Sequence, residues 1–106
     1  MKPKWIIFED EFHITFRLAN IEFHKDLLPK TYKKVYGGGM FHYDKESDTL
    51  YLYHTSFDFG SVDPEVFKQD IWIQSSRFEH SKIKFSNEMC FNGDPLERIT
   101  DWIQVK

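Results

Sequence analysis

The chain has 106 residues, a formal net charge of −3 and 41% hydrophobic residues, which include eleven Phe, five Tyr and three Trp. This length is enough for one domain with a real core and too short for two, so residues 1–106 are expected to form a single domain. The negative charge and the lack of a basic run argue against nucleic acid as the main partner.

The first third of the chain predicts two paired strands and a short helical segment. Residues 5–8 are an apolar run typical of a buried strand. From Phe12 to Leu18 apolar and polar residues alternate, as in a half-buried strand, and this strand is expected to pair with the first. The apolar residues between 24 and 34 lie roughly on one helical face, but Pro29 limits them to one or two helical turns.

The middle of the chain predicts a β-hairpin. Residues 40–44 and 49–55 are strand-like, and the turn-like residues 45–48 connect them. If this turn closes the hairpin, Phe41 and Leu52 share the core face, whereas Met40 and Tyr53 share the opposite face.

The last third predicts two helices and one more strand. Asp63 and Pro64 are typical of a helix start, and the main helix is expected near 64–75, although residues 71–73 also suit a strand. Residues 82–86 alternate like a strand, and the sequence after Asp94 predicts a C-terminal helix. The expected fold is α+β: a single small domain with a mixed β-sheet of about five to six strands flanked by two helices.

The cellular location follows from the cysteine content and the apolar pattern. Cys90 is the only cysteine, and one thiol cannot form an internal disulfide, so a reducing compartment is expected. No secretory signal opens the chain, and no stretch has the apolar length of a membrane span. We therefore expect a cytoplasmic protein with no membrane partner. The five histidines lack the spacing of standard metal sites, so no metal is expected.

Three segments carry possible chemistry: residues 22–27 (Glu-Phe-His-Lys-Asp-Leu), the glycines 37–39, and residues 53–60 (Tyr-His-Thr-Ser-Phe-Asp-Phe-Gly). His24 can act as a nucleophile or general base, or it is an ordinary surface or capping histidine. The glycines permit close approach of a ligand or a positive φ, or they form a flexible turn. Amides after Ser56 can hold an anion, or this is a loop closed by Gly60.

The order of these three segments resembles the Janus/Ocnus family, whose best-known member is the phosphohistidine phosphatase. The resemblance covers roughly residues 12–86 and leaves 87–106 as a C-terminal extension. It implies a metal-independent phosphatase without cofactors, which acts on phosphohistidine or a related phosphoramidate in a phosphorylated protein or peptide. It implies that His24 is catalytic. The phosphate-binding residues implied are Arg17, Lys25, Ser56, Phe57 and Asp58.

Several departures from the family pattern leave other functions open. Met40 follows the glycine run where the family has Arg, and His54 stands where the family has Gly. Fewer cations weaken phosphate binding, so one alternative is an inactive phosphate- or phosphopeptide-binding module. Another is a protein-interaction module that uses exposed aromatic residues such as Phe57. A monomer or weak dimer is expected in each case.

Overall fold

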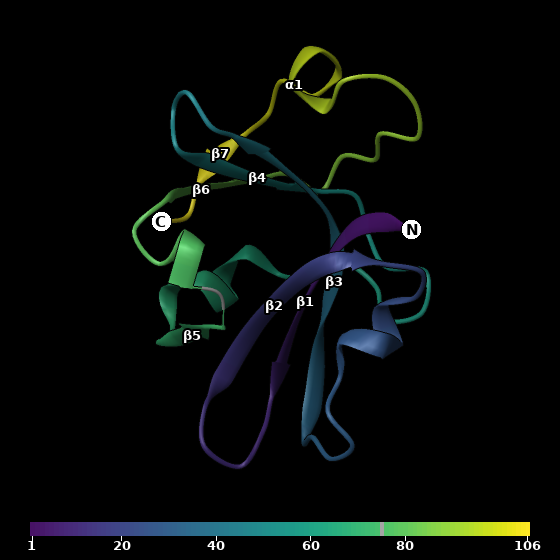
Figure 1. The fold of residues 1–106 in the computed structure, drawn as a ribbon, viewed down its shortest axis with the longest axis vertical. Coiled ribbons are helices and arrows are strands. Elements are labelled where there is room, and N and C mark those ends of the chain that lie inside the picture. Colours follow the sequence, from purple (N-terminus) through teal and green to yellow (C-terminus); the bar gives the residue numbers. More distant parts are fainter. Residues whose placement is uncertain (75) are drawn as a thin grey trace.

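Seven strands form one mixed β-sheet in the computed structural model, which describes residues 1–74 and 76–106 (Figure 1). Their order across the sheet is β5-β2-β1-β3-β4-β6-β7. The pairs β2–β5 and β4–β6 are parallel, and the other neighbouring strands are antiparallel. The strands are β1 (Lys2–Glu9), β2 (Ile14–Ile21), β3 (Lys34–Asp44), β4 (Thr49–Tyr53), β5 (Ile71–Ile73), β6 (Lys82–Phe85) and β7 (Ile103–Gln104).

The two predicted N-terminal strands are confirmed as the antiparallel pair β1–β2. Trp5 lies opposite Leu18, and Ile7 lies opposite Phe16. Residues that lie directly opposite in a sheet share a face, so these four side chains form one apolar surface. Phe12 does not extend it, because this residue precedes β2 in the turn and is 86% exposed.

The predicted hairpin is confirmed as β3–β4, together with its two faces. Phe41 pairs with Leu52, and Met40 pairs with Tyr53. Leu52 is fully buried in the main core, against which Phe41 packs. Met40 packs instead with Tyr53 in a separate cluster on the opposite side of the sheet. The period-two pattern therefore predicted correctly which side chains face the core.

The face that carries Trp5 and Ile7, here called the inner face, holds the main hydrophobic core. Side chains from both ends of the strand order join this core, namely Ile71 and Ile73 of β5 and Val105 next to β7. Strands at opposite edges can reach the same core only if the sheet curls around it. The sheet is therefore curved like half of a barrel, with the inner face concave (Figure 1).

The predicted α+β fold, with five to six strands flanked by two helices, is wrong, because the described residues form seven strands and only short helical turns. The predicted main helix near 64–75 is a 3-10 turn, η2 (Pro64–Lys68), which Asp63 caps as expected. The chain then enters β5, because its two isoleucines suit an extended backbone and the edge of β2 offers hydrogen-bond partners. The predicted helix end at Ser75 lies outside the described residues.

The predicted C-terminal helix is also much shorter than expected. It begins at the predicted place, where Asp94 accepts a hydrogen bond from the backbone of Leu96, but α1 spans only Pro95–Arg98. Poor helix formers follow at Thr100 and Asp101, and the chain continues into β7 beside β6.

No helix in the part of the chain that the structure describes is long and apolar enough to cross a membrane.

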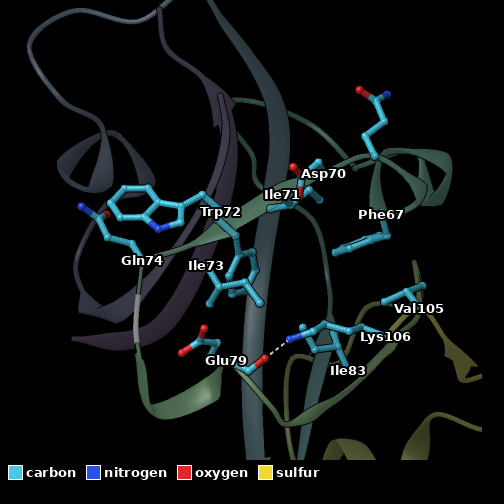
Figure 2. Close-up of a pocket in the computed structure, with 12 residues that line it drawn as sticks. Phe67, Asp70, Ile71, Trp72, Ile73, Gln74, Glu79, Ile83, Val105 and Lys106 are labelled. Carbon is cyan, nitrogen blue, oxygen red and sulfur yellow. Dashed lines mark hydrogen bonds between the residues drawn. The ribbon is translucent and has the colours of Figure 1, made fainter. Parts of the chain in front are cut away.

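The inner face is open at a groove of about 510 Å³ between β5 and the C-terminal strands (Figure 2). Ile71 and Ile73 of β5 line this groove together with Ile83 of β6. At its C-terminal end Lys106 donates a hydrogen bond to the backbone carbonyl of Glu79 (Figure 2). The described residues that line the groove include none of those that the sequence singled out for chemistry.

The opposite face of the sheet, here called the outer face, carries Ile6 and Phe8 and is covered by two separate segments. The 3-10 turn η1 (His24–Leu27) packs its apolar end on these two side chains. The C-terminal segment 87–102 packs apolar side chains on Tyr53, at the end of β4. This arrangement leaves a space between the two segments.

Candidate functional site

A pocket of about 570 Å³ lies on the outer face between η1 and the C-terminal segment. We call it the outer-face pocket. Its floor comes from the outward side chains of β1 and β3, and its walls come from η1, the loop after β4 and the C-terminal segment. The lining residues are Met1, Lys2, Lys4, Glu22, Phe23, His24, Met40, His54, Thr55, Phe57, Asp58, Cys90 and Phe91.

The three segments singled out in the sequence meet at Gly38. The backbone N–H of Ser56 donates to the Gly38 carbonyl over 3.0 Å, and the Gly38 N–H donates to the Gly60 carbonyl over 3.2 Å. On the outer side, a Cβ added at Gly38 would lie 3.0 Å from Cδ2 of His24. The glycine run thus provides a flat surface for the histidine ring and for the serine loop.

The ring of His24 is held by one backbone contact. Its Nε2 lies 2.8 Å from the carbonyl oxygen of Gly39, and the side chain is buried. A carbonyl only accepts hydrogen bonds, so Nε2 carries a proton. In the neutral ring the other nitrogen, Nδ1, then holds a lone pair, which is the form that a base or nucleophile requires.

His24 is kept neutral and keeps some access to solvent. Burial lowers its pKa, the hydrogen bond to Gly39 raises it, Lys4 lowers it and Asp58 raises it, and the net pKa lies below the usual value. The side-chain polar atoms in the described chain that are sealed from solvent without a partner belong to Thr15 and Arg17. Nδ1 of His24 is not among these buried atoms, so solvent can reach it.

A second histidine, His54, lines the same pocket with the opposite ring nitrogen engaged. The backbone N–H of Cys90 donates to its Nδ1 over 3.1 Å. Nδ1 therefore has no proton, and in the neutral ring Nε2 carries it. Burial lowers the pKa of His54, and the nearby Lys2 and His24 lower it further.

The loop after β4 contributes residues to the pocket but not its serine. Ser56 is 2% exposed, and its Oγ accepts a hydrogen bond from the Phe59 N–H over 3.1 Å. Phe57 and Asp58, in contrast, line the pocket. Of these three predicted phosphate-binding residues, Ser56 thus lies outside the pocket lining, whereas Phe57 and Asp58 belong to it.

The cations of the pocket come from the N-terminus of the chain. Lys2 and Lys4 line it, because they alternate on the outer side of β1. Lys25, which the sequence predicted, does not line it, and its ammonium lies 5.4 Å from the centre of the Phe23 ring. The carboxylates of Glu22 and Asp58 oppose anions in the same pocket, so the excess of positive charge is small.

Arg17, the other predicted phosphate ligand, lies outside the outer-face pocket. Its Nη1 donates to the Leu27 carbonyl over 2.8 Å, and its guanidinium lies 5.0 Å from the centre of the Phe8 ring. Arg17 lines a different pocket, near the β1–β2 turn. These contacts show a structural role, in which Arg17 fixes the end of η1.

The substitution Arg17→Met tests this assignment. Because the Leu27 carbonyl loses its partner, the free energy of unfolding is expected to fall by about 1–3 kcal/mol, while phosphate affinity stays unchanged in folded protein. Urea unfolding and a phosphate titration measure the two quantities. Unchanged stability with lost phosphate binding would place Arg17 in the ligand site instead.

Stability is expected to depend on pH through the two pocket histidines. Both have a pKa lowered from 6.5, so the unfolded chain binds protons more readily than the folded one. Their contribution is complete above 6.5 and is lost as the pH falls from there toward the folded pKa values. The exposed carboxyls with lowered pKa, Asp10 and Asp48, start from 3.8 and act only at lower pH.

Thermal unfolding at pH values between about 5 and 7.5 measures this effect, and Tm is expected to fall toward the acidic end. The variants His24→Gln and His54→Asn, which cannot take up the proton, should each show a smaller fall. A Tm that is constant across this range would contradict the pKa directions.

Sequence reasoning missed several lining residues. Lys2 and Lys4 are two residues apart at the start of β1, so they lie on the same face of this strand. This spacing indicates that both face the pocket once β1 is known to pair with β3. His54 lies near the end of the predicted strand 49–55 and was noted only as a departure from the family and as one of five histidines without metal-site spacing. Cys90 and Phe91 had no local signal. Among the residues that the structure describes, no three His, Cys, Asp or Glu side chains are grouped to hold a metal ion.

Comparison of the chain with protein-family models, with curated proteins and with solved structures found no match. The resemblance to the Janus/Ocnus family therefore stays a prediction that rests on the three ordered segments.

Proposed function

We propose that the outer-face pocket binds the phosphoryl group of a phosphorylated protein or peptide, and that His24 promotes metal-independent hydrolysis of phosphohistidine or a related phosphoramidate there. The observation that carries this proposal is the state of His24. Its Nε2 is engaged by Gly39, so an unprotonated Nδ1 remains in a pocket that Lys2 and Lys4 also line.

In this reaction Nδ1 of His24 takes a proton from a water molecule. The water oxygen forms a bond to phosphorus as the P–N bond breaks, and the departing nitrogen takes up a proton from solvent water. The ammonium groups of Lys2 and Lys4 stabilise the charge on the phosphoryl oxygens, together with the backbone amides of residues 57 and 58. The Gly39 carbonyl stabilises the protonated ring that forms.

The second candidate is a binding module of the same architecture without turnover. It is favoured by one observation, which is that Ser56 is 2% exposed and is not among the residues that line the pocket. The site then lacks one donor for the transferring phosphoryl group. Phe57, which is 83% exposed at the pocket, would contact the partner protein.

The test is phosphate release from a phosphohistidine peptide by the wild-type protein in the presence of a metal chelator, with peptide binding measured in parallel. Release that persists with the chelator supports the enzyme. Binding without release supports the module. Neither binding nor release, in protein shown to be folded, would contradict both.

A further inference from the structure

We propose that His54 is a ligand-binding residue of this site, whose Nε2–H donates a hydrogen bond to an anionic oxygen of the bound phosphoryl group. This inference rests on the proposed function and adds a specific donor to it. It assigns the two histidines complementary tasks, since His24 presents a lone pair at Nδ1 and His54 presents a proton at Nε2.

The tautomer of His54 follows from its contact with the C-terminal segment. The Cys90 N–H occupies the lone pair of Nδ1, and protonation of Nδ1 would remove this hydrogen bond. In the neutral ring Nε2 is therefore the nitrogen that carries the proton. Like Nδ1 of His24, Nε2 of His54 is not among the buried side-chain atoms of the described residues that lack a hydrogen-bond partner, so solvent can reach it. Because His54 lines the outer-face pocket, Nε2–H is its free donor there.

The backbone at His54 supports a role beyond packing. Its φ is +68°, in the left-handed region that glycine adopts without strain and that only a few per cent of other residues adopt. Strained positions of this kind are kept where surrounding contacts hold them, and they concentrate at functional sites. A glycine would serve the turn itself better, so the imidazole has another use.

Contacts from three sides hold the ring in one orientation. The backbone N–H of His54 donates to the Glu88 carbonyl over 2.9 Å, and Cys90 engages Nδ1. The rings of Phe91 and Phe57 meet the imidazole nearly at right angles, with centroids 4.8 and 6.2 Å away. A donor whose direction is set before the ligand arrives binds more tightly, because no rotamer freedom is lost on binding.

The charge around His54 suits an anionic acceptor. The pocket places Lys2 close enough to lower the pKa of His54, so the same ammonium attracts a phosphoryl group to this side. A neutral donor next to a cation binds the anion without adding a buried charge. The donor also takes the place of the Ser56 hydroxyl, which is buried and does not line the pocket.

Two substitutions separate this role from a purely structural one. In His54→Asn the amide oxygen stands in place of Nδ1 and can accept from Cys90, asparagine tolerates the positive φ, and the distal donor is lost. In His54→Gln the amide nitrogen stands in place of Nε2 and keeps the donor, but the contact with Cys90 is lost.

The experiment titrates inorganic phosphate into the wild type and both variants, followed by NMR, after circular dichroism has established that each is folded. Long-range ¹H–¹⁵N correlations first identify the protonated nitrogen of His54, which is expected to be Nε2 and to shift on phosphate addition. His54→Asn is expected to bind phosphate about tenfold more weakly or worse, while His54→Gln keeps most of the affinity.

The outcomes distinguish this inference from the function on which it rests. Phosphate binding that is unchanged in His54→Asn, or a proton found on Nδ1, overturns the donor role and leaves the proposed function intact. Loss of binding in His54→Gln alone shows that His54 only anchors the C-terminal segment. No phosphate or phosphohistidine peptide binding by the folded wild type overturns the proposed function, and this inference with it.

Discussion

The substitution His24→Gln is expected to lower phosphohistidine hydrolysis by about 10²- to 10⁴-fold, which is the contribution of a general base. The amide nitrogen of glutamine can stand in place of Nε2 and keep the hydrogen bond to the Gly39 carbonyl. It offers no atom equivalent to Nδ1. The fold should therefore persist while the lone pair that accepts the proton disappears.

The matched control is His24→Ala, which removes both nitrogens. It leaves the Gly39 carbonyl unpaired, so it should lose activity and also about 1–3 kcal/mol of stability. Single-turnover hydrolysis and urea unfolding of the two variants separate chemistry from folding. Turnover by His24→Gln close to the wild-type rate would show that His24 is not the base, and the binding function would then be the better description of the pocket.

The second large effect is expected for Gly38→Ala, which should lower the free energy of unfolding by about 3 kcal/mol. A Cβ at this position would lie 2.4 Å from the carbonyl oxygen of Trp5 and 3.0 Å from Cδ2 of His24. Because the closest atom is backbone in the centre of the sheet, it cannot move aside without opening strand pairing. By thermal unfolding this corresponds to a fall in Tm of roughly 12–24 °C.

Gly39→Ala is the control that separates the sheet from the site. Its Cβ would lie 2.2 Å from the Tyr53 carbonyl oxygen and 3.0 Å from Nε1 of Trp5, so it should destabilise the sheet to a similar extent. Only Gly38→Ala presses on the ring of His24. In the folded fraction at low temperature, the NMR signals of His24 should therefore shift more in Gly38→Ala. Wild-type stability of Gly38→Ala would contradict the pairing of Ile6 with Gly38.

The local pattern of the sequence predicted β1, β2, β4, β6 and the second half of β3, but it missed residues 34–39 of β3 and β7 and predicted the helices poorly. A strand places Ile7 and Phe16 on one face whatever lies next to them, and the predicted faces held in β1–β2 and in the paired part of β3–β4. Cap residues marked both helix starts correctly, at Asp63 and Asp94. A cap specifies only where helical hydrogen bonding begins. The chain after each cap then forms a strand, β5 or β7, because the edges of β2 and β6 offer hydrogen-bond partners.

The sequence by itself determined which side chains share a strand face in β1–β2 and β3–β4, and it singled out His24 and the glycine run as candidates. Only the tertiary structure decided which other groups share the pocket. His24 reaches Gly39 across fifteen positions of the chain, and His54 reaches Cys90 across thirty-six. Contacts of this kind depend on strand order and on which face of each strand looks outward. Local patterns do not encode strand order, because it is set by how the whole apolar surface is buried.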